Sequence, residues 1–116
     1  MTIQNDVPII QKVYNFYRLF YDQIDHFPKK SREVLIKKIE QIILELLELF
    51  FLASYSSKDN KLQLLNRANT KVDFLKTLIR LLYDLKIINQ IKYIELEKQL
   101  QEIGKMLGGW LKFLKG

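Results

Sequence analysis

The sequence predicts an all-α protein, an antiparallel up-down-up-down four-helix bundle, from three observations. Apolar residues recur at alternating spacings of three and four along four segments, which is the period of an amphipathic helix. Only four glycines and two prolines occur in 116 residues, and no segment alternates with the period of a strand. Short polar stretches separate the segments, so antiparallel neighbours would be joined by short loops. The length predicts a single domain, residues 1–116.

The first helix is expected over about 8–27. Pro8 is suited to a first helical turn, with Asn5 or Asp6 as the N-cap. The helix should end just before Pro28, because proline disfavours a helical conformation at the preceding residue. Its apolar stripe comprises Ile10, Val13, Tyr17, Phe20, Ile24 and Phe27.

The second helix is expected over about 31–55, with Ser31 as its cap. Its apolar arc is wide, which indicates contacts on more than one side. The main stripe holds Leu35, Ile39, Ile42, Leu46, Phe50 and Ala53, and the arc is widened by Ile36, Ile43 and Leu47.

A polar loop at 55–60 precedes a third helix, expected over about 59–86, and Asn89 would cap a fourth over about 89–114. The third helix carries one stripe of Leu65, Ala68, Val72, Leu75, Ile79 and Leu82, and a second of Phe74, Leu78, Leu81 and Leu85. The fourth carries Tyr93, Leu96, Leu100, Ile103, Leu107, Trp110 and Leu114.

These apolar arcs exceed what one small bundle needs, so we expect identical subunits to bury part of them; a deep monomer core is the alternative. Gly104 and Gly108 lie one helical turn apart, although glycine costs a helix interior about 1 kcal/mol relative to alanine. They indicate the close approach of another backbone, either within the bundle or between subunits. Candidate interface or close-packing residues are Gly104, Gly108, Trp110, Tyr14, Tyr21, Phe74 and Leu78.

Catalytic and metal chemistry find little support in the sequence. There is no cysteine, and His26 is the only histidine, which makes a poor zinc site. Glu45 and Glu48 lack the Glu-x-x-His partners of a di-metal bundle and are expected to form salt bridges or a polar edge. No phosphate loop or nucleophile motif is present. We therefore expect no enzyme, metal or cofactor. Without a secretory signal or a spanning segment, a cytoplasmic protein with no membrane contact is expected.

Charge is the strongest functional indication, because 19 basic residues against 13 acidic ones leave +6 per chain. Basic clusters can hold phosphate backbones without reading sequence, although solvated charged faces are the common alternative. The aromatic run from Tyr14 to Tyr21 could stack bases, but its helical spacing favours core packing. The candidate nucleic-acid or partner contacts are Arg67, Lys71, Lys76 and Arg80, followed by Lys29, Lys30 and Arg32.

Residues 102–112, EIGKMLGGWLK, resemble the C-terminal signature of a family of small bacterial four-helix bundles. Residues 27–32 (FPKKSR), 44–50 (LELLELF) and 75–84 (LKTLIRLLYD) resemble its first turn and middle helices, so the resemblance extends from about Ile9 to Lys112. Two groups share the signature. One comprises the ribosomal-RNA intervening-sequence proteins, and the other the accessory variability determinant (Avd) proteins of diversity-generating retroelements.

The resemblance implies a non-catalytic homopentameric barrel. In the Avd group this barrel binds nucleic acid, as template RNA and cDNA, together with a reverse transcriptase, and it supports mutagenic retrohoming. Five copies at +6 each would carry +30, which favours the Avd-like interpretation. The alternative is an intervening-sequence protein, a structural oligomer of undefined role. The basic residues named above are electrostatic expectations and not positions taken from the family.

Overall fold

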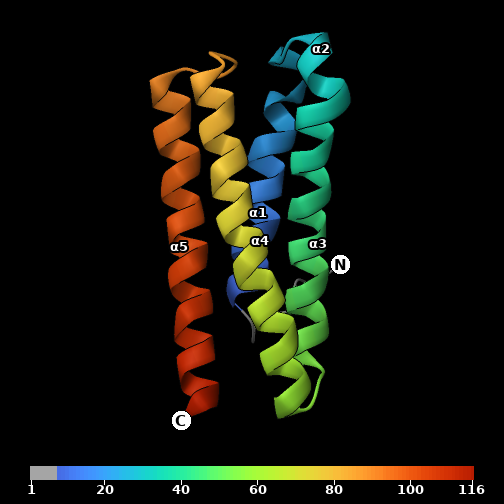
Figure 1. Ribbon diagram of the computed structural model, residues 1–116, viewed down its shortest axis with the longest axis vertical. Coiled ribbons are helices and arrows are strands. Elements are labelled where there is room, and N and C mark those ends of the chain that lie inside the picture. Colours follow the sequence, from blue (N-terminus) through green and yellow to red (C-terminus); the bar gives the residue numbers. More distant parts are fainter. Residues whose placement is uncertain (1–7) are drawn as a thin grey trace.

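The computed structural model describes residues 8–116, which form four long helices running alternately up and down (Figure 1). These are α1 (Pro8–Gln23), α3 (Lys37–Ser54), α4 (Lys58–Asp84) and α5 (Gln90–Lys115). No strand occurs among the described residues, so the predicted all-α class is confirmed for them. Asn5 and Asp6, the expected caps of the first helix, lie outside the described residues.

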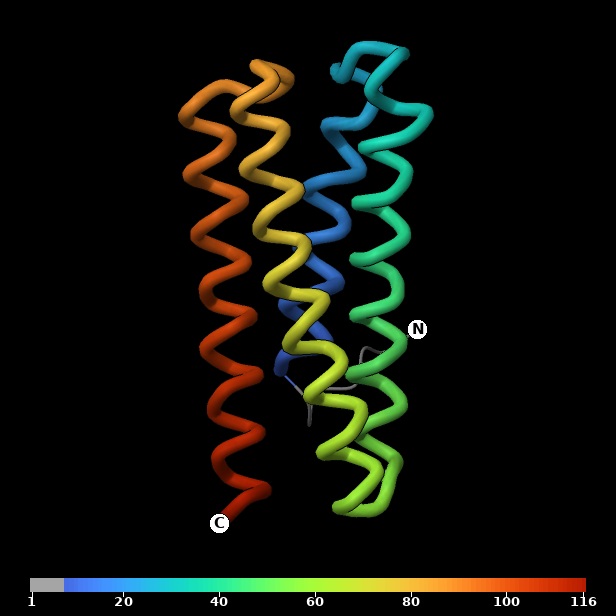
Figure 2. Tube along the Cα trace, in the orientation of Figure 1, coloured from blue at the N-terminus to red at the C-terminus, as the bar shows by residue number. Residues whose placement is uncertain are grey.

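The four helices form a square arrangement in which α1 contacts α3 and α5, and α4 contacts the same two. The tube in Figure 2 shows α1 (blue) passing behind α4 (yellow to green), between α3 and α5. Consecutive long helices are therefore neighbours, as short connections require. The bundle measures 44 × 29 × 22 Å along its principal axes.

The connection from α1 to α3 is helical almost throughout. After α1 come a 3₁₀ turn, η1 (Ile24–His26), then Phe27 in an extended conformation before Pro28 (φ −85°, ψ 147°). The chain becomes helical again at α2 (Lys29–Ser31) and continues through a π turn, η2 (Arg32–Ile36), into α3.

Ser31 is not the cap of the second helix. Its backbone is already helical (φ −70°, ψ −31°) and its side chain makes no capping hydrogen bond. Proline explains the difference, because Pro28 fixes its own φ and cannot donate to a preceding turn, which suits it to the start of a helix. The chain therefore turns helical directly after Pro28, two residues earlier than expected.

The remaining turns are tight. The α3–α4 loop is shorter than expected and contains only residues 55–57. After α4, Lys86 adopts a left-handed conformation (φ 63°), and the amides of Lys86 and Ile87 donate to the carbonyls of Tyr83 and Leu82. This is the hydrogen-bond pattern of a Schellman motif. Asn89 then caps α5, accepting from the Lys92 amide at 2.8 Å, as predicted.

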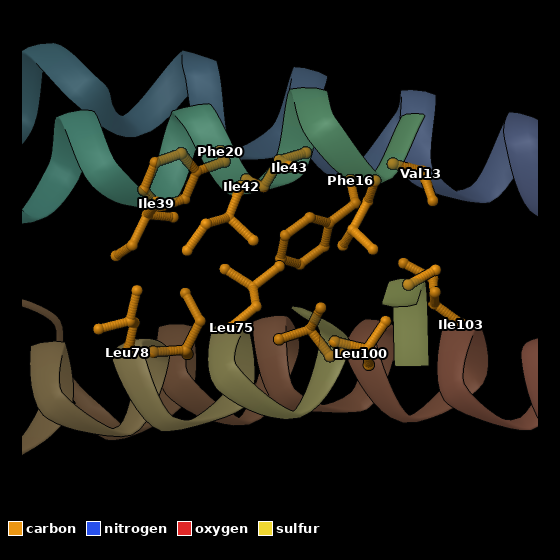
Figure 3. Packing of buried hydrophobic residues seen from close by; sticks show 14 of the residues in the cluster. Val13, Phe16, Phe20, Ile39, Ile42, Ile43, Leu75, Leu78, Leu100 and Ile103 are labelled. Atoms are coloured by element: carbon orange, nitrogen blue, oxygen red, sulfur yellow. The ribbon is translucent and has the colours of Figure 1, made fainter. Parts of the chain in front are cut away.

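The core lies where the α1–α3 pair meets the α4–α5 pair, and Figure 3 shows side chains such as Phe16 and Ile43 pointing toward Leu75 and Leu100. Every residue of the main stripe predicted for the third helix is buried. On α1 the prediction was wrong at one position: Phe16 is fully buried, whereas Tyr17 is only partly buried and reaches the groove between α1 and α3. No helix within residues 8–116 combines the length and apolarity needed to cross a bilayer.

Candidate nucleic-acid interface

The basic residues predicted on the third helix divide between two flanks of α4. Arg67 and Lys71 are one helical turn apart on the flank toward α3, where Lys71 Nζ lies 2.9 Å from Glu45 Oε2. Lys76 and Arg80 are one turn apart on the flank toward α5, where the Arg80 guanidinium lies over the Tyr93 ring. The structure therefore does not bring the four cations together into one patch.

The Lys71–Glu45 ion pair ties α4 to α3 and is only partly exposed, at 28% and 34% of the two side chains. It confirms the expectation that Glu45 forms a salt bridge. Lys71 is consequently engaged within the chain, and its charge is partly neutralised before any partner arrives. Arg67, by contrast, is exposed.

The α5-facing flank of α4 carries a cluster that we call the Arg80 platform, made of Arg80, Tyr83, Asp84 and Tyr93. The Tyr83 and Tyr93 rings stack with centroids 4.9 Å apart and an interplanar angle of 21°. Arg80 Cζ lies 5.7 Å from the first centroid and 5.8 Å from the second, and Arg80 Nε donates to Asp84 Oδ1 at 2.9 Å. Tyr93, followed by Asp84, raises the pKa of Arg80 above its ordinary value.

Sequence reasoning singled out Arg80 but not the two tyrosines. One feature of the sequence could have indicated that Tyr93 lies near Arg80. The short turn at 85–89 folds α5 back along α4 and places the first turn of α5 beside the last turns of α4. Tyr93 was instead assigned to the apolar stripe of the fourth helix.

A groove lies below the platform between α4 and α5, with a volume of about 430 Å³. It is lined from α4 by Asn69, Val72, Asp73 and Lys76, and from α5 by Gln101, Gly104 and Lys105. A side-chain carbon at Gly104 would lie 3.5 Å from Lys76 Nζ, an ordinary contact distance. Gly104 therefore contributes no side chain to the groove beside the Lys76 ammonium, although the space would accommodate one.

The cations predicted at the first turn lie at one end of the bundle. Lys29 and Lys30 are exposed in α2, and Arg32 Nη1 is 3.8 Å from Asp25 Oδ1. Figure 1 shows α2 at the upper end, where the α4–α5 turn also lies. The first-turn cluster is therefore an end surface and not part of the groove between α4 and α5.

Exposed apolar side chains occur on all four long helices, including Leu44, Phe51 and Leu52 of α3 and Ile91 and Ile94 of α5. The first set lies between α1 and α3, and we call it the tyrosine groove: a hollow of about 350 Å³ is lined by Tyr14, Tyr17, Arg18, Tyr21 and Asp22 of α1 and by Leu47 of α3. Tyr21 is 61% exposed. The Tyr17 hydroxyl donates to Glu40 Oε2 at 2.8 Å. Burial, and then this carboxylate, raises the pKa of Tyr17 to about 12.

The second set, the α4 apolar patch, consists of Phe74, Leu81 and Leu85, which are 47%, 39% and 56% exposed. Leu78 lies beside them but is 8% exposed and belongs to the core. It was one of the candidates for interface or close packing, and its low exposure favours close packing.

The helix glycines do not mark a close approach within the chain. At Gly108 an added side-chain carbon would meet no atom within 4 Å, and at Gly104 only the tip of Lys76 is near. Close backbone packing inside one bundle, one of the two alternatives considered for these residues, is therefore wrong. Trp110 packs partly buried against the core and lines a hollow of about 460 Å³ with Met106 and Phe113.

Side chains that carry charge lie at the surface of the described chain, with none buried, and no group of three or more His, Asp or Glu residues within 8–116 is placed to hold a metal ion. The class that emerges is a basic helical bundle whose polar chemistry is confined to its outer faces. The model of the bAvd-like family matches residues 7–114, and the chain belongs to that family. The match confirms the resemblance and its Avd-like branch. No curated protein matches the chain.

Proposed function

We propose that this protein is the accessory subunit of a diversity-generating retroelement: a non-catalytic, basic, oligomeric scaffold that binds template RNA and cDNA together with a reverse transcriptase and supports mutagenic retrohoming. The observation that carries the proposal is membership of the bAvd-like family over residues 7–114. The net charge of +6 supports a polyanionic partner. This role places the protein in the cytoplasm, requires no cofactor and involves no membrane.

Self-association is supported by the two apolar surfaces. The tyrosine groove lies between α1 and α3, whereas the α4 apolar patch lies on another side of the bundle. Because these surfaces differ, contact of one with the other is heterologous, and heterologous contacts close into rings when the rotation allows. A homopentamer, as the family resemblance implies, is one such ring. We assign Arg67 and Lys71 to the rim of this interface.

Assembly through those two surfaces leaves the side formed by α4 and α5 open. That side carries Lys76 and, above the groove, Arg80 with its partner Asp84; Lys105 lies across the groove, which Asp73 also lines. Repeated around a ring, it would present a periodic band of cations to a phosphate backbone. We assign the principal nucleic-acid contacts to this band, with Lys29, Lys30 and Arg32 as a second set at the end of the bundle.

Three measurements test the proposal on the full chain. Light scattering is expected to show an oligomer at micromolar concentration. Gel shifts with structured RNA are expected to show affinity that falls steeply as salt is raised. Co-purification is expected to retain the reverse transcriptase of the retroelement. A folded monomer, or RNA affinity that ignores ionic strength, would overturn the corresponding part of the proposal.

Matched double variants locate the RNA surface. Lys76→Gln with Arg80→Gln removes two charges from the α4–α5 side, and Lys29→Gln with Lys30→Gln removes two from the end. The first pair is expected to weaken RNA binding more than the second, although both change the net charge equally. Equal losses would mean that only overall charge matters, and would contradict the assignment of the α4–α5 side.

A further inference from the structure

The Arg80 platform is an exposed planar surface whose orientation is fixed. The guanidinium is held over two stacked rings and by the Asp84 carboxylate, yet its side chain remains 59% exposed. Tyr83 and Tyr93 are partly buried and pack against the core, whereas Arg80 and Asp84 are exposed. What it offers to solvent is a flat, delocalised cation backed by two aromatic rings.

The Asp84 contact determines which ligand chemistry suits this surface. The carboxylate oxygen lies 2.9 Å from Arg80 Nε and offsets much of the positive charge there, so Arg80 is a weaker phosphate ligand than a free arginine. The same contact fixes the guanidinium plane. Guanidinium planes and aromatic rings are the surfaces on which unpaired bases stack, and stacking does not need a full net charge.

A phosphate-binding group lies beside the platform. Lys76 is four residues from Arg80, about 6 Å along α4, and lines the groove with Lys105. The side-chain amides of Asn69 and Gln101 add hydrogen-bonding groups to the same groove, which the Asp73 carboxylate also lines. Gly104 contributes no side chain beside the Lys76 ammonium.

We propose that the Arg80 platform and this groove together form a binding site for single-stranded nucleic acid, in which an unpaired base stacks on Arg80 and the adjoining phosphate lies beside Lys76. The inference rests on the proposed function and adds to it the class of ligand, an unpaired segment in place of a duplex. A duplex cannot fill the site, because its bases are already stacked on their neighbours.

The test uses the full-length protein and two fluorescent RNAs with the same number of phosphates, one unstructured and one a closed hairpin. The Arg80→Lys substitution keeps the positive charge and removes the planar guanidinium group. It is expected to lower affinity for the unstructured strand by about 5- to 100-fold and for the hairpin by less than about twofold. The hairpin, which carries the same number of phosphates, controls for a general loss of affinity.

Two substitutions at Tyr93 test the platform independently of Arg80, in case the Arg80→Lys variant misfolds. Tyr93→Phe keeps the ring and is expected to bind as the unmodified protein does, whereas Tyr93→Leu is expected to lose affinity for the unstructured strand selectively. Photo-cross-linking with a halogenated uridine probe is expected to modify the peptide that contains Tyr83 or Tyr93. Adducts confined to Tyr14 and Tyr21 would overturn the inference.

The outcomes separate this inference from the proposed function. If the unmodified protein binds neither RNA, the proposed function fails and the inference with it. If it binds both and Arg80→Lys weakens both equally or neither, only the inference is overturned. If Arg80→Lys retains RNA but loses the reverse transcriptase, the platform is a protein-docking surface, and the inference is likewise overturned.

Discussion

Lys71 and Glu45 form an ion pair, with Nζ and Oε2 2.9 Å apart, that joins α4 to α3. We therefore expect Lys71 to act within the fold and not on RNA. Lys71→Met should lower the free energy of unfolding by about 0.5 kcal/mol, because the pair is partly exposed and screened. It should change RNA affinity by less than about twofold. Urea denaturation and gel shifts measure the two quantities.

Lys76→Met is the matched control on the opposite flank of α4. It should weaken RNA binding and reduce the steepness of its salt dependence by about one, with little change in stability. A double-mutant cycle with Glu45→Gln isolates the coupling energy of the ion pair. A loss of RNA affinity in Lys71→Met as large as in Lys76→Met would contradict this division of roles.

Gly108 has open space around it within the chain, so the helix loses stability there without an internal benefit. Gly108→Ala should stabilise the fold by about 1 kcal/mol. The glycine spacing in the sequence also allows a neighbouring subunit to approach at Gly108, and in that case the same variant should weaken assembly. Thermal unfolding at high dilution and sedimentation at micromolar concentration separate the two effects.

Gly109 is the control for this substitution, because it also has open space but lies about 100° further around α5. Gly109→Ala should stabilise the helix and leave assembly unchanged. If Gly108→Ala associates as readily as the unmodified chain, Gly108 is not at a subunit contact.

The hydroxyl of Tyr17 should make stability depend on pH in the alkaline range. Its pKa is raised from 10.0 to about 12 in the folded chain. A folded pKa above the unfolded one favours the protonated, folded form, so its contribution is complete below pH 10 and is lost as the pH rises through about 12. Tyr17→Phe, which removes the Glu40 hydrogen bond, should cost about 1 kcal/mol near neutrality.

The difference in unfolding free energy between the unmodified chain and Tyr17→Phe should therefore shrink as the pH rises. Taking this difference cancels the titration of lysines that both proteins share. Tyr14→Phe, in the same groove, controls for the loss of a hydroxyl as such. A difference that stays constant up to pH 12 would show that Tyr17 does not titrate in the way its burial requires.

Lys86 adopts a positive φ of 63° at the end of α4, a conformation that carries a steric penalty for residues with a side chain. Lys86→Gly should raise the free energy of unfolding by about 1 kcal/mol, because glycine has no such penalty at a helix C-terminus. Lys98→Gly, within α5, should lower it by about the same amount. Chemical denaturation of both variants measures the contrast, and destabilisation by Lys86→Gly would refute the argument.

The buried face of α4 could be predicted from the sequence, because its apolar residues follow one unambiguous series at spacings of three and four. On α1 the pattern was ambiguous, because either Phe16 or Tyr17 continues the spacing of three and four residues between Val13 and Phe20. The choice depends on α3, which supplies Glu40 to the Tyr17 hydroxyl. Spacing along one helix contains no information about that partner.

The candidate site was likewise predictable where it depends on spacing along one helix, and was not predictable where it depends on contacts between helices. Lys76 and Arg80 could be placed on one flank of a helix from their spacing. The Tyr93 ring over which Arg80 lies is contributed by α5, and its position depends on the register between two helices. Contacts between subunits depend on a second molecule, so local sequence patterns predict them even less well.

The buried side chains of residues 8–116 are all aliphatic or aromatic, with no polar or charged side chain among them. Added electrolyte should therefore leave the folded chain intact while it displaces bound polyanions. Dissociation of nucleic acid can then be measured over a wide range of ionic strength, because a loss of affinity at high salt reports weakened ionic contacts and not unfolding of the protein.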